Sequence, residues 1–244
     1  MDTRHYQTLY KTEKFHWWYK VRRKITHNLI DTYVDKTKSL KILDVGCGTG
    51  ELLVELSSLG ESFGIDNSPE AVKFSKEKGL KNILISEGTE IPFSDNYFDV
   101  VLCLDVLEHI QDDQKTIQEI FRVAKTGATV IIFVPTFKFL WGKSDDISHH
   151  IRRYRLPELR KKIEQSGLKV IRSSYFNFFL FFPILLARFL VRIFKIPIKS
   201  ENEIEVGKGL VNSTLFKIFS LESKVLKRSN FSFGVSGLVV AKKN

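Results

Sequence analysis

Residues 42–50 read ILDVGCGTG, an apolar run followed by three glycines at alternate positions. The run from Lys41 to Val45 predicts a buried strand, and Glu51 is expected to begin a helix. Glycine at alternate positions lets the backbone approach a ligand with no Cβ in the way. The turn also aims the first backbone N–H groups of the next helix at whatever is bound. The stretch therefore predicts a ligand site between a strand and a helix.

Two other nucleotide-binding turns fit these residues poorly. A dinucleotide fold requires Gly-x-Gly-x-x-Gly, but Glu51 stands at the third glycine position, where its carboxylate would repel a pyrophosphate. No Gly-Lys-Ser/Thr follows, which excludes a nucleoside-triphosphate loop. A ligand with a cationic centre and no phosphates suits the turn better, and S-adenosylmethionine is such a ligand. The sequence resembles the class I S-adenosylmethionine-dependent methyltransferases of the small-molecule type.

A carboxylate ends the second expected strand. Asp66 lies twenty residues beyond Gly46, a spacing at which an acid can accept from both ribose hydroxyls, and with the glycine turn present we favour this role over a cap of the next helix. The resemblance further implies that Glu87 accepts from the adenine amino group and that Gly88 contacts the ring through its backbone. The predicted cofactor-binding residues are Asp44, Gly46, Cys47, Gly48, Gly50, Asp66, Asn67, Glu87, Gly88 and Leu104.

Strand and helix patterns alternate after the turn, which predicts an α/β fold. We expect a doubly wound, mostly parallel seven-stranded sheet whose last strand, from Phe233 to Ala241, is antiparallel. Ligand loops in such sheets lie beyond the carboxyl ends of the strands, where the residues above fall. The predicted divisions are a helical lid at 1–40, the cofactor-binding core at 41–175, a helical insertion between the last two strands at 176–230 and the final strand at 231–244.

The composition favours anionic partners. The 244 residues include 38 Lys and Arg and 28 Asp and Glu, a net charge of +10. Cys47 and Cys103 do not resemble a disulfide or a metal-ligand pair, and the N-terminus lacks the apolar run of a signal peptide. We therefore expect a cytoplasmic protein, with peripheral attachment to the inner face of the membrane left open.

The first forty residues are helical in pattern and basic. Trp17 and Trp18 are adjacent, so we expect that only one of them can face a core and that the other faces a pocket or partner. Trp18 and Arg22 are therefore predicted acceptor contacts on a helical lid over the cofactor. An amphipathic helix packed on the sheet is the alternative.

The segment after the fourth strand reads Asp105-Val-Leu-Glu108-His109. Asp105, Glu108 and His109 would share one helical face, and the pattern resembles the divalent-metal set of some quinone O-methyltransferases. A capping box, with Asp105 as the N-cap, is the alternative that we favour. No metal is therefore predicted, and these three residues are the candidates if one is used.

A basic run follows the fifth strand. His150 is the predicted catalytic base, because the pKa of histidine lies near working pH. The resemblance supports this, since His-x-Arg-Arg-Tyr recurs in related methyltransferases. A solvated basic loop is the alternative, above all for His149. The predicted acceptor contacts in this run are His149, Arg152, Arg153 and Tyr154.

The insertion begins with an aromatic and aliphatic segment at 176–195, in which Arg188 and Arg192 recur one helical turn apart. Its unbroken apolar run is about half the roughly 20 residues of a transmembrane span. Basic residues beside a Phe- and Leu-rich face predict a helix in a membrane interface. A tunnel for a long apolar acceptor, plain core packing and a homodimer contact remain open. Relatives with this tail resemble enzymes of cell-surface glycan or lipid pathways.

The predicted function is S-adenosylmethionine-dependent O-methylation of a small-molecule or lipid-linked acceptor, such as a phosphate-bearing glycan or a quinone-like compound. The alternative is an RNA- or tRNA-modifying methyltransferase, which the basic balance and the aromatic N-terminus favour. The absence of an Asn/Asp-Pro-Pro-Tyr run after the fourth strand counts against methylation of a nucleic-acid base amine.

Overall fold

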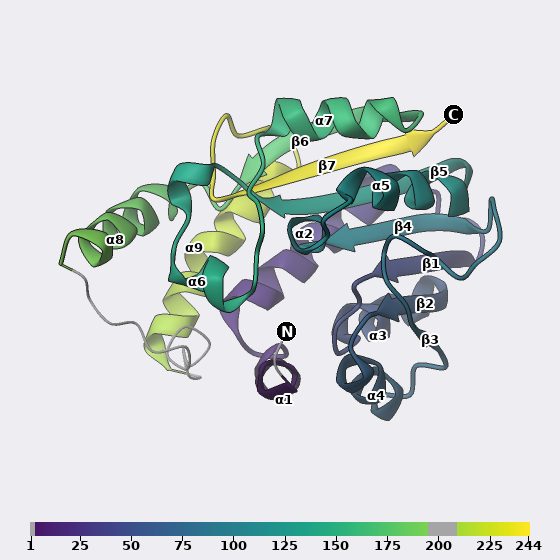
Figure 1. The fold of residues 1–244 in the computed structure, drawn as a ribbon, viewed down its shortest axis with the longest axis horizontal. Coiled ribbons are helices and arrows are strands. Elements are labelled where there is room, and N and C mark those ends of the chain that lie inside the picture. The colour runs from purple at the N-terminus through teal and green to yellow at the C-terminus, as the bar shows by residue number, and fades with distance from the viewer. Residues whose placement is uncertain (1–2, 195–208) are drawn as a thin grey trace.

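A seven-stranded sheet forms the centre of the chain (Figure 1). This computed structural model describes residues 3–194 and 209–244. The strands are β1 (Leu40–Val45), β2 (Gly60–Asp66), β3 (Asn82–Ile85), β4 (Phe98–Leu104), β5 (Ala124–Pro135), β6 (Leu168–Phe176) and β7 (Ser236–Lys243).

The strand order is β3-β2-β1-β4-β5-β7-β6, and only β7 runs antiparallel to its neighbours. The predicted fold class, a mostly parallel sheet with an antiparallel last strand, is therefore confirmed. Strands β4 and β5 are buried on both faces and read as near-continuous apolar runs, as expected at the centre of a parallel sheet. The final strand begins at Ser236, three residues later than predicted, and it inserts between β5 and β6.

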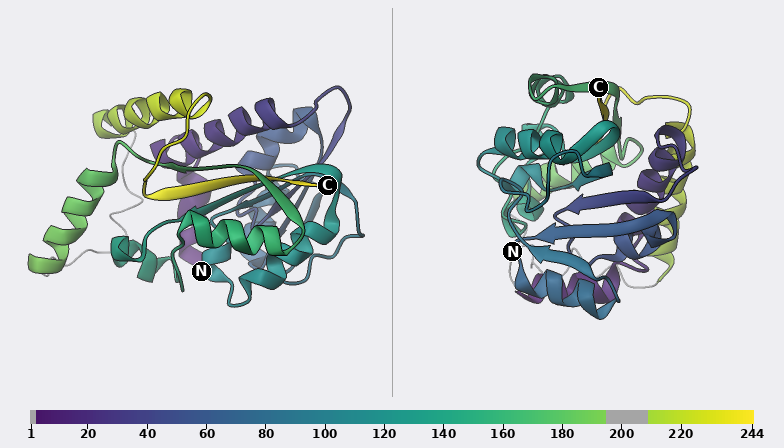
Figure 2. Two further views of the ribbon diagram at one scale, coloured as in Figure 1. Left: turned by 90° about the horizontal axis from the view of Figure 1, so that it is seen from above. Right: turned by 90° about the vertical axis from the view of Figure 1, so that its right-hand side faces the viewer.

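Helices cover both faces of the sheet, as the views in Figure 2 show. Helices α2 and α9 pack on one face, and α5 and α7 on the other. The α-helices are α1 (Thr3–Thr12), α2 (Trp17–Tyr33), α3 (Glu51–Leu56), α4 (Pro69–Glu77), α5 (Asp113–Val123), α6 (Lys143–Ile147), α7 (Leu156–Gln165), α8 (Phe181–Phe194) and α9 (Leu210–Leu226). Short 3₁₀ turns lie at Ser57–Leu59, Leu107–His109 and Lys138–Leu140.

The chain after β4 differs from the prediction. Asp105 adopts a left-handed conformation (φ 57°) and lies before the 3₁₀ turn Leu107–His109, whose N-cap is Val106. The predicted shared helical face of residues 105, 108 and 109, and the capping box on Asp105, are therefore wrong. The next α-helix, α5, is capped instead by Asp112, whose carboxylate accepts from the N–H of Lys115 at 3.0 Å.

The insertion contributes to the core through α9. Phe219 of α9 is fully buried and stacks against Phe176, while Trp17 and Trp18 both pack against it with ring centroids 5.7 and 5.6 Å away. The expectation that only one tryptophan can face a core is wrong, because Phe219 of α9 contacts both indoles. None of the helices in the described ranges is both long enough and apolar enough to cross a bilayer.

Substitution of Phe219 by Ala should lower the free energy of unfolding by about 3–5 kcal/mol, because it leaves a cavity under both tryptophans. Urea denaturation followed by tryptophan fluorescence measures this loss. Leu221 on the same helix is 57% exposed, so Leu221→Ala should change the stability by less than about 0.5 kcal/mol. Equal effects of the two substitutions would contradict the placement of α9 against the sheet.

Candidate active site

A cavity of about 1270 Å³ opens at the carboxyl ends of the parallel strands. Residues at the ends of β1, β2, β4 and β5 line it, together with parts of α2, α6 and α8. This is where ligands bind in open α/β sheets, at the point where the strand order reverses. The reversal here lies between β1 and β4. From β1 the chain adds β2 and β3 on one side, and it then returns to add β4 on the other side of β1.

The glycine turn after β1 is held against the end of β2. The N–H groups of Gly46 and Cys47 both donate to the carbonyl of Ile65, at 2.8 and 3.0 Å. The N–H of Gly48 donates to the Asp66 carboxylate at 2.9 Å. Gly46 has a φ of +75°, and a Cβ there would lie 2.3 Å from Val106, so no other residue fits without displacement. The turn therefore requires glycine for backbone conformation and for space.

Two buried carboxylates, those of Asp44 and Asp66, make this part of the pocket suited to a cation. Asp44 is 5% exposed, and its Oδ1 has no hydrogen-bond partner within the described part of the chain. Burial, and then the charge of Asp66, raise the pKa of Asp44 to about 8. An unpaired buried carboxylate is costly unless a positive group binds to it. The methionine part of S-adenosylmethionine carries an ammonium and a sulfonium, so Asp44 fits this cofactor.

Nine of the ten predicted cofactor-binding residues line the cavity. The exception is Gly50, which is the N-cap of α3 in a left-handed conformation (φ 80°) and supports the turn from behind. Gly88 is buried, and a Cβ there would approach Ile110 and Thr116 to 3.0 and 3.1 Å. Which atoms of a bound cofactor these residues contact stays a prediction.

The N-terminal helices are fastened to the cofactor end of the pocket. The hydroxyl of Tyr6 donates to Asp66 at 3.3 Å, and Thr49 of the glycine turn donates to the Glu13 carboxylate. Lys78 pairs with Glu13 and, at 2.8 Å, with Glu51. The negative charge of Glu51, which we used to argue against a pyrophosphate, is therefore compensated by a lysine distant in sequence.

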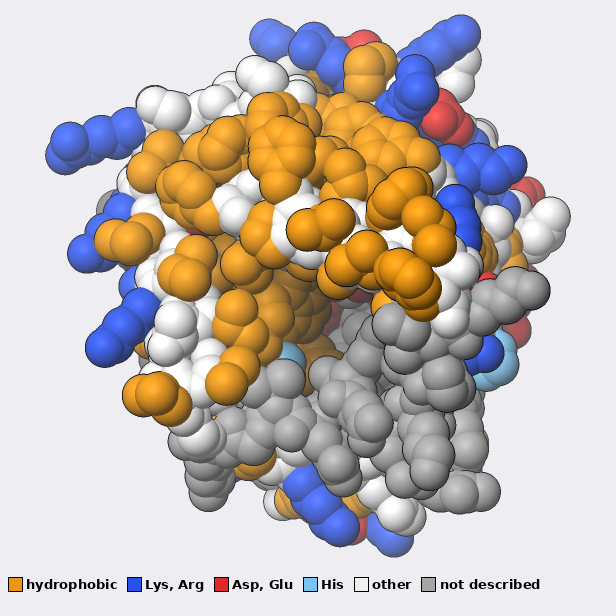
Figure 3. All heavy atoms as spheres, turned by 90° about the vertical axis from the view of Figure 1, so that its left-hand side faces the viewer, with side chains coloured by type: hydrophobic (Ala, Val, Ile, Leu, Met, Phe, Trp, Pro, Cys, Tyr) orange, Lys and Arg blue, Asp and Glu red, His pale blue; other side chains and the backbone are white. Residues whose placement is uncertain are grey.

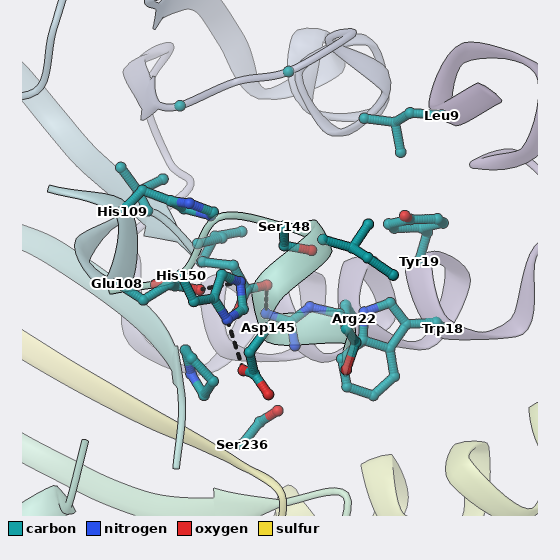
Figure 4. A pocket seen from close by; sticks show the side chains of 18 of the residues that line it. Leu9, Trp18, Tyr19, Arg22, Glu108, His109, Asp145, Ser148, His150 and Ser236 are labelled. Atoms are coloured by element: carbon teal, nitrogen blue, oxygen red, sulfur yellow. Dashed lines mark hydrogen bonds and ion pairs between the residues drawn. The ribbon is translucent and has the colours of Figure 1, made fainter. Parts of the chain in front are cut away.

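Asp145 and His150 form a hydrogen-bonded pair on the wall of the cavity (Figure 4). His150 Nδ1 lies 2.9 Å from Asp145 Oδ1. Burial would raise the pKa of Asp145, but hydrogen bonds from His150 and Arg153 outweigh it and lower the pKa to about 2. The ionised carboxylate holds the proton on Nδ1, which leaves Nε2 as the atom that can accept a proton.

Glu108 and His109 lie beside His150, and the ligand atoms of these three residues are within 4.8 Å of one another. Glu108 is fully buried, and its oxygens lack hydrogen-bond partners among the described residues. Burial, and then the charge of Asp105, raise the pKa of Glu108 well above its usual range. Burial lowers the pKa of His109 to about 4, with the charge of His150 as the next cause.

Asp105 is drawn away from this group by an ion pair with Arg22. Within the described ranges, the group that could hold a metal is therefore Glu108, His109 and His150, rather than the candidate set with Asp105. Arg22 itself is 7% exposed and lies over the rings of Trp18, Phe133 and Phe176, each 5.0–5.2 Å away. Both Arg22 and Trp18 line the cavity, as predicted for acceptor contacts.

Three predicted acceptor contacts lie outside the cavity. His149 is exposed, Arg152 pairs with Asp113 at 2.9 Å, and Tyr154 is 1% exposed with its hydroxyl 2.8 Å from Asp113. Within this run only His150 and Arg153, three residues apart, line the cavity, so only part of the basic run reaches it. Arg153 lines the cavity but holds Asp145 at 2.7 Å, which makes it a positioning residue.

Sequence reasoning missed two contributors to the site. Asp145 stands five residues before His150 in the same run, and the signal that could have found it is an acid within reach of a histidine across one short helix. Arg188 and Arg192 of α8 also line the cavity, although we expected them at a membrane interface. The hydrophobic periodicity of the sequence does not show which face of such a helix is directed toward the pocket.

The fold and the pocket define a class of Rossmann-like protein that binds an adenosine cofactor with a cationic centre. A sequence family described as "Methyltransferase domain" matches residues 43–132. The chain is 30% identical to ajmaline N-methyltransferase of Rauvolfia serpentina over 78% of this chain and 65% of that enzyme. It is 32% identical to an uncharacterized protein of Methanocaldococcus jannaschii, over 79% of this chain and 78% of that one.

A solved structure agrees with these matches. Phosphoethanolamine N-methyltransferase 2 of Haemonchus contortus, in complex with S-adenosyl-L-methionine, superposes with a TM-score of 0.57 at 19% identity, over 89% of this chain and 52% of that one. The chain belongs to the class I S-adenosylmethionine-dependent methyltransferase family, whose cofactor is S-adenosylmethionine. It spans 65% of the ajmaline enzyme and 38–49% of three other curated relatives.

Binding of S-adenosylmethionine at pH 7 should release close to one proton. Asp44, with a pKa of about 8, is mostly protonated in the free protein and must ionise to pair with the ligand's ammonium. Affinity should therefore rise as the pH increases from 6 to 7. Titration calorimetry in phosphate and in Tris, which have different ionisation enthalpies, measures the released proton.

Asp44→Asn is the control for this titration. It should remove the dependence on buffer and weaken binding about 10- to 100-fold, through loss of a charged hydrogen bond. A wild-type enthalpy that is the same in both buffers would show that Asp44 does not pair with the ammonium.

Proposed function

We propose that the chain is a methyltransferase that transfers the methyl group of S-adenosylmethionine to an oxygen atom of its acceptor. The observation that carries the proposal is the Asp145–His150 pair in the same cavity as the glycine turn. A hydroxyl acceptor must lose its proton as the new bond forms, whereas a neutral amine attacks without a base. Two of the relatives compared are named for methylation of nitrogen, so the proposal of oxygen rests on this pair alone.

S-adenosylmethionine, when bound, supplies a methyl group on a positively charged sulfur. Asp44 and the glycine turn hold the cofactor end of the pocket, and Trp18 and Arg22 face the acceptor end. His150 Nε2 takes the acceptor's proton, and Asp145 stabilises the imidazolium that results. In this proposal α1 and the segment after it act as a lid, because Tyr6 and Glu13 fasten them to Asp66 and Thr49 beside the cofactor end.

Alignment of the reacting atoms should contribute more than proton transfer. Positioning can lower a barrier by about 7–11 kcal/mol, whereas a general base contributes about 10²–10⁴-fold in rate. The acceptor is a small molecule or a lipid-linked compound with a hydroxyl group, since the cavity of about 1270 Å³ exceeds what the cofactor alone would fill.

His150→Ala should lower kcat about 10²–10⁴-fold with little change in cofactor affinity, because the base acts on the acceptor. Asp145→Asn should also lower kcat, because it no longer favours the His150 tautomer with its proton on Nδ1. His149→Ala is the matched control and should retain activity, since its side chain is exposed outside the cavity. Release of S-adenosylhomocysteine in the presence of the acceptor measures all three.

Two outcomes would contradict the role of His150 as a base. Full activity of His150→Ala would show that the acceptor needs no base and favour a nitrogen acceptor. Loss of wild-type activity in EDTA, restored by Mn²⁺ or Zn²⁺, would make His150 a metal ligand with Glu108 and His109.

A further inference from the structure

Helix α8 (Phe181–Phe194) has two faces with different surroundings. One face lines the cavity, through residues that fall on one side of a helix at 3.6 residues per turn. These residues are Ile184, Ala187, Arg188, Val191 and Arg192. The wall of the pocket near its mouth is therefore provided by α8, an element outside the seven-stranded sheet.

The opposite face of α8 is apolar and exposed. Its side chains recur at intervals of three and four residues, which places them on one stripe. They are Phe182, Leu186, Phe189, Leu190 and Ile193, with exposed fractions between 39% and 63%. Figure 3 shows hydrophobic side chains gathered over this end of the molecule, around a hollow. A contiguous apolar surface of this kind marks an interaction site.

The charged residues of α8 point away from the apolar stripe. Arg188 donates to the Ser144 hydroxyl at 3.2 Å and Arg192 to the Trp141 carbonyl at 3.4 Å, both on the side of α6 and the pocket. The stripe is thus hydrocarbon along the helix, while the guanidinium groups lie on the side of the pocket. A helix that lies in a membrane interface has this arrangement.

Charge favours a lipid surface over a second copy of the chain. The net charge is +10, and residues 176–230 contain nine basic and four acidic side chains. One of those acids, Glu222, is buried against the N–H groups of Phe178 and Phe179 and does not reach the surface. Two copies would repel each other, whereas an anionic bilayer attracts each Lys or Arg near its surface.

The length of α8 suits a position in the plane of the bilayer. Its 14 residues extend about 21 Å at 1.5 Å per residue, short of the roughly 30 Å of a hydrocarbon core. If the stripe is immersed, the pocket face of the same helix lies at the level of the lipid headgroups. An amphiphile in that bilayer would then reach the cavity past Ala187 and Val191 without crossing water.

We propose that α8 docks on an anionic bilayer and that the acceptor is an amphiphile of that bilayer, which enters the cavity along the inner face of α8. The claim that this amphiphile receives the methyl group rests on the proposed function, but the docking of α8 does not. The two parts therefore have separate tests.

Docking is tested by co-sedimentation of the full chain with vesicles of phosphatidylcholine and phosphatidylglycerol. Leu186→Glu/Phe189→Glu should weaken vesicle binding about tenfold or more, because it places two carboxylates in the stripe. The control, Val54→Glu/Ile85→Glu, adds the same charge at exposed apolar positions of α3 and β3 and should bind as the wild type does. Circular dichroism checks that both variants are folded.

A second measurement does not depend on the charged variant. Tryptophan introduced as Phe189→Trp should be quenched by brominated phosphatidylcholine in these vesicles more than the three native tryptophans are. Equal binding of the stripe variant and its control, together with no added quenching, would overturn docking by α8. So would a wild-type dimer that Leu186→Glu/Phe189→Glu dissociates, because the stripe would then be an interface between copies.

The acceptor is tested by incubating the protein with methyl-labelled S-adenosylmethionine and a whole-cell extract. Labelled product in the organic phase of a solvent partition supports an amphiphilic acceptor. Labelled product found only in the aqueous phase, after removal of the unreacted cofactor, overturns it. Vesicle binding with no labelled product in either phase would count against the proposed function and not against the docking of α8.

Discussion

The turn between β1 and α3 is the constraint on which the rest of the site depends. Its N–H groups bond to the last residues of β2, so the ends of the two strands and the start of α3 are fixed relative to one another. Left-handed backbone at Gly46, Gly48 and Gly50 makes this possible, and the missing side chains leave the space that a ligand fills. The acids of the site follow from this geometry, because strand-end side chains meet at one edge.

Four acids brought to one edge would repel each other without compensation. Asp105 pairs with Arg22 and Asp145 with Arg153, each from another element. Among the described residues no Lys or Arg pairs with Asp44 or Glu108, and burial raises the pKa of both acids. These two acids lie in different parts of the cavity. Asp44 is suited to the cofactor's ammonium, and Glu108 lies beside His150. Buried acids without a cationic partner thus mark where ligands are expected.

The sheet, and the presence of nine proposed cofactor residues in one cavity, could be predicted because they depend on local patterns. Apolar runs, alternate glycines and the acid at position 66 each reflect the strand or turn that contains them. The residues on the acceptor side of the cavity could not be predicted in the same way, because their placement depends on contacts between side chains that are distant in sequence. Tyr154 looked like a site residue in the sequence and is buried against Asp113, while Asp145 was overlooked and orients His150. The left-handed Asp105 likewise broke a helix that its neighbours in sequence predict.

The division of the pocket explains why the comparisons assign a cofactor more readily than an acceptor. The family match covers residues 43–132, which include every predicted cofactor residue. Trp18, Arg22 and His150 lie outside it, as does α8. Within the match, the segment with Glu108 and His109 lies beside His150. Elements outside this match therefore provide much of the pocket wall, and in our proposal the two-faced helix α8 restricts which acceptors can enter.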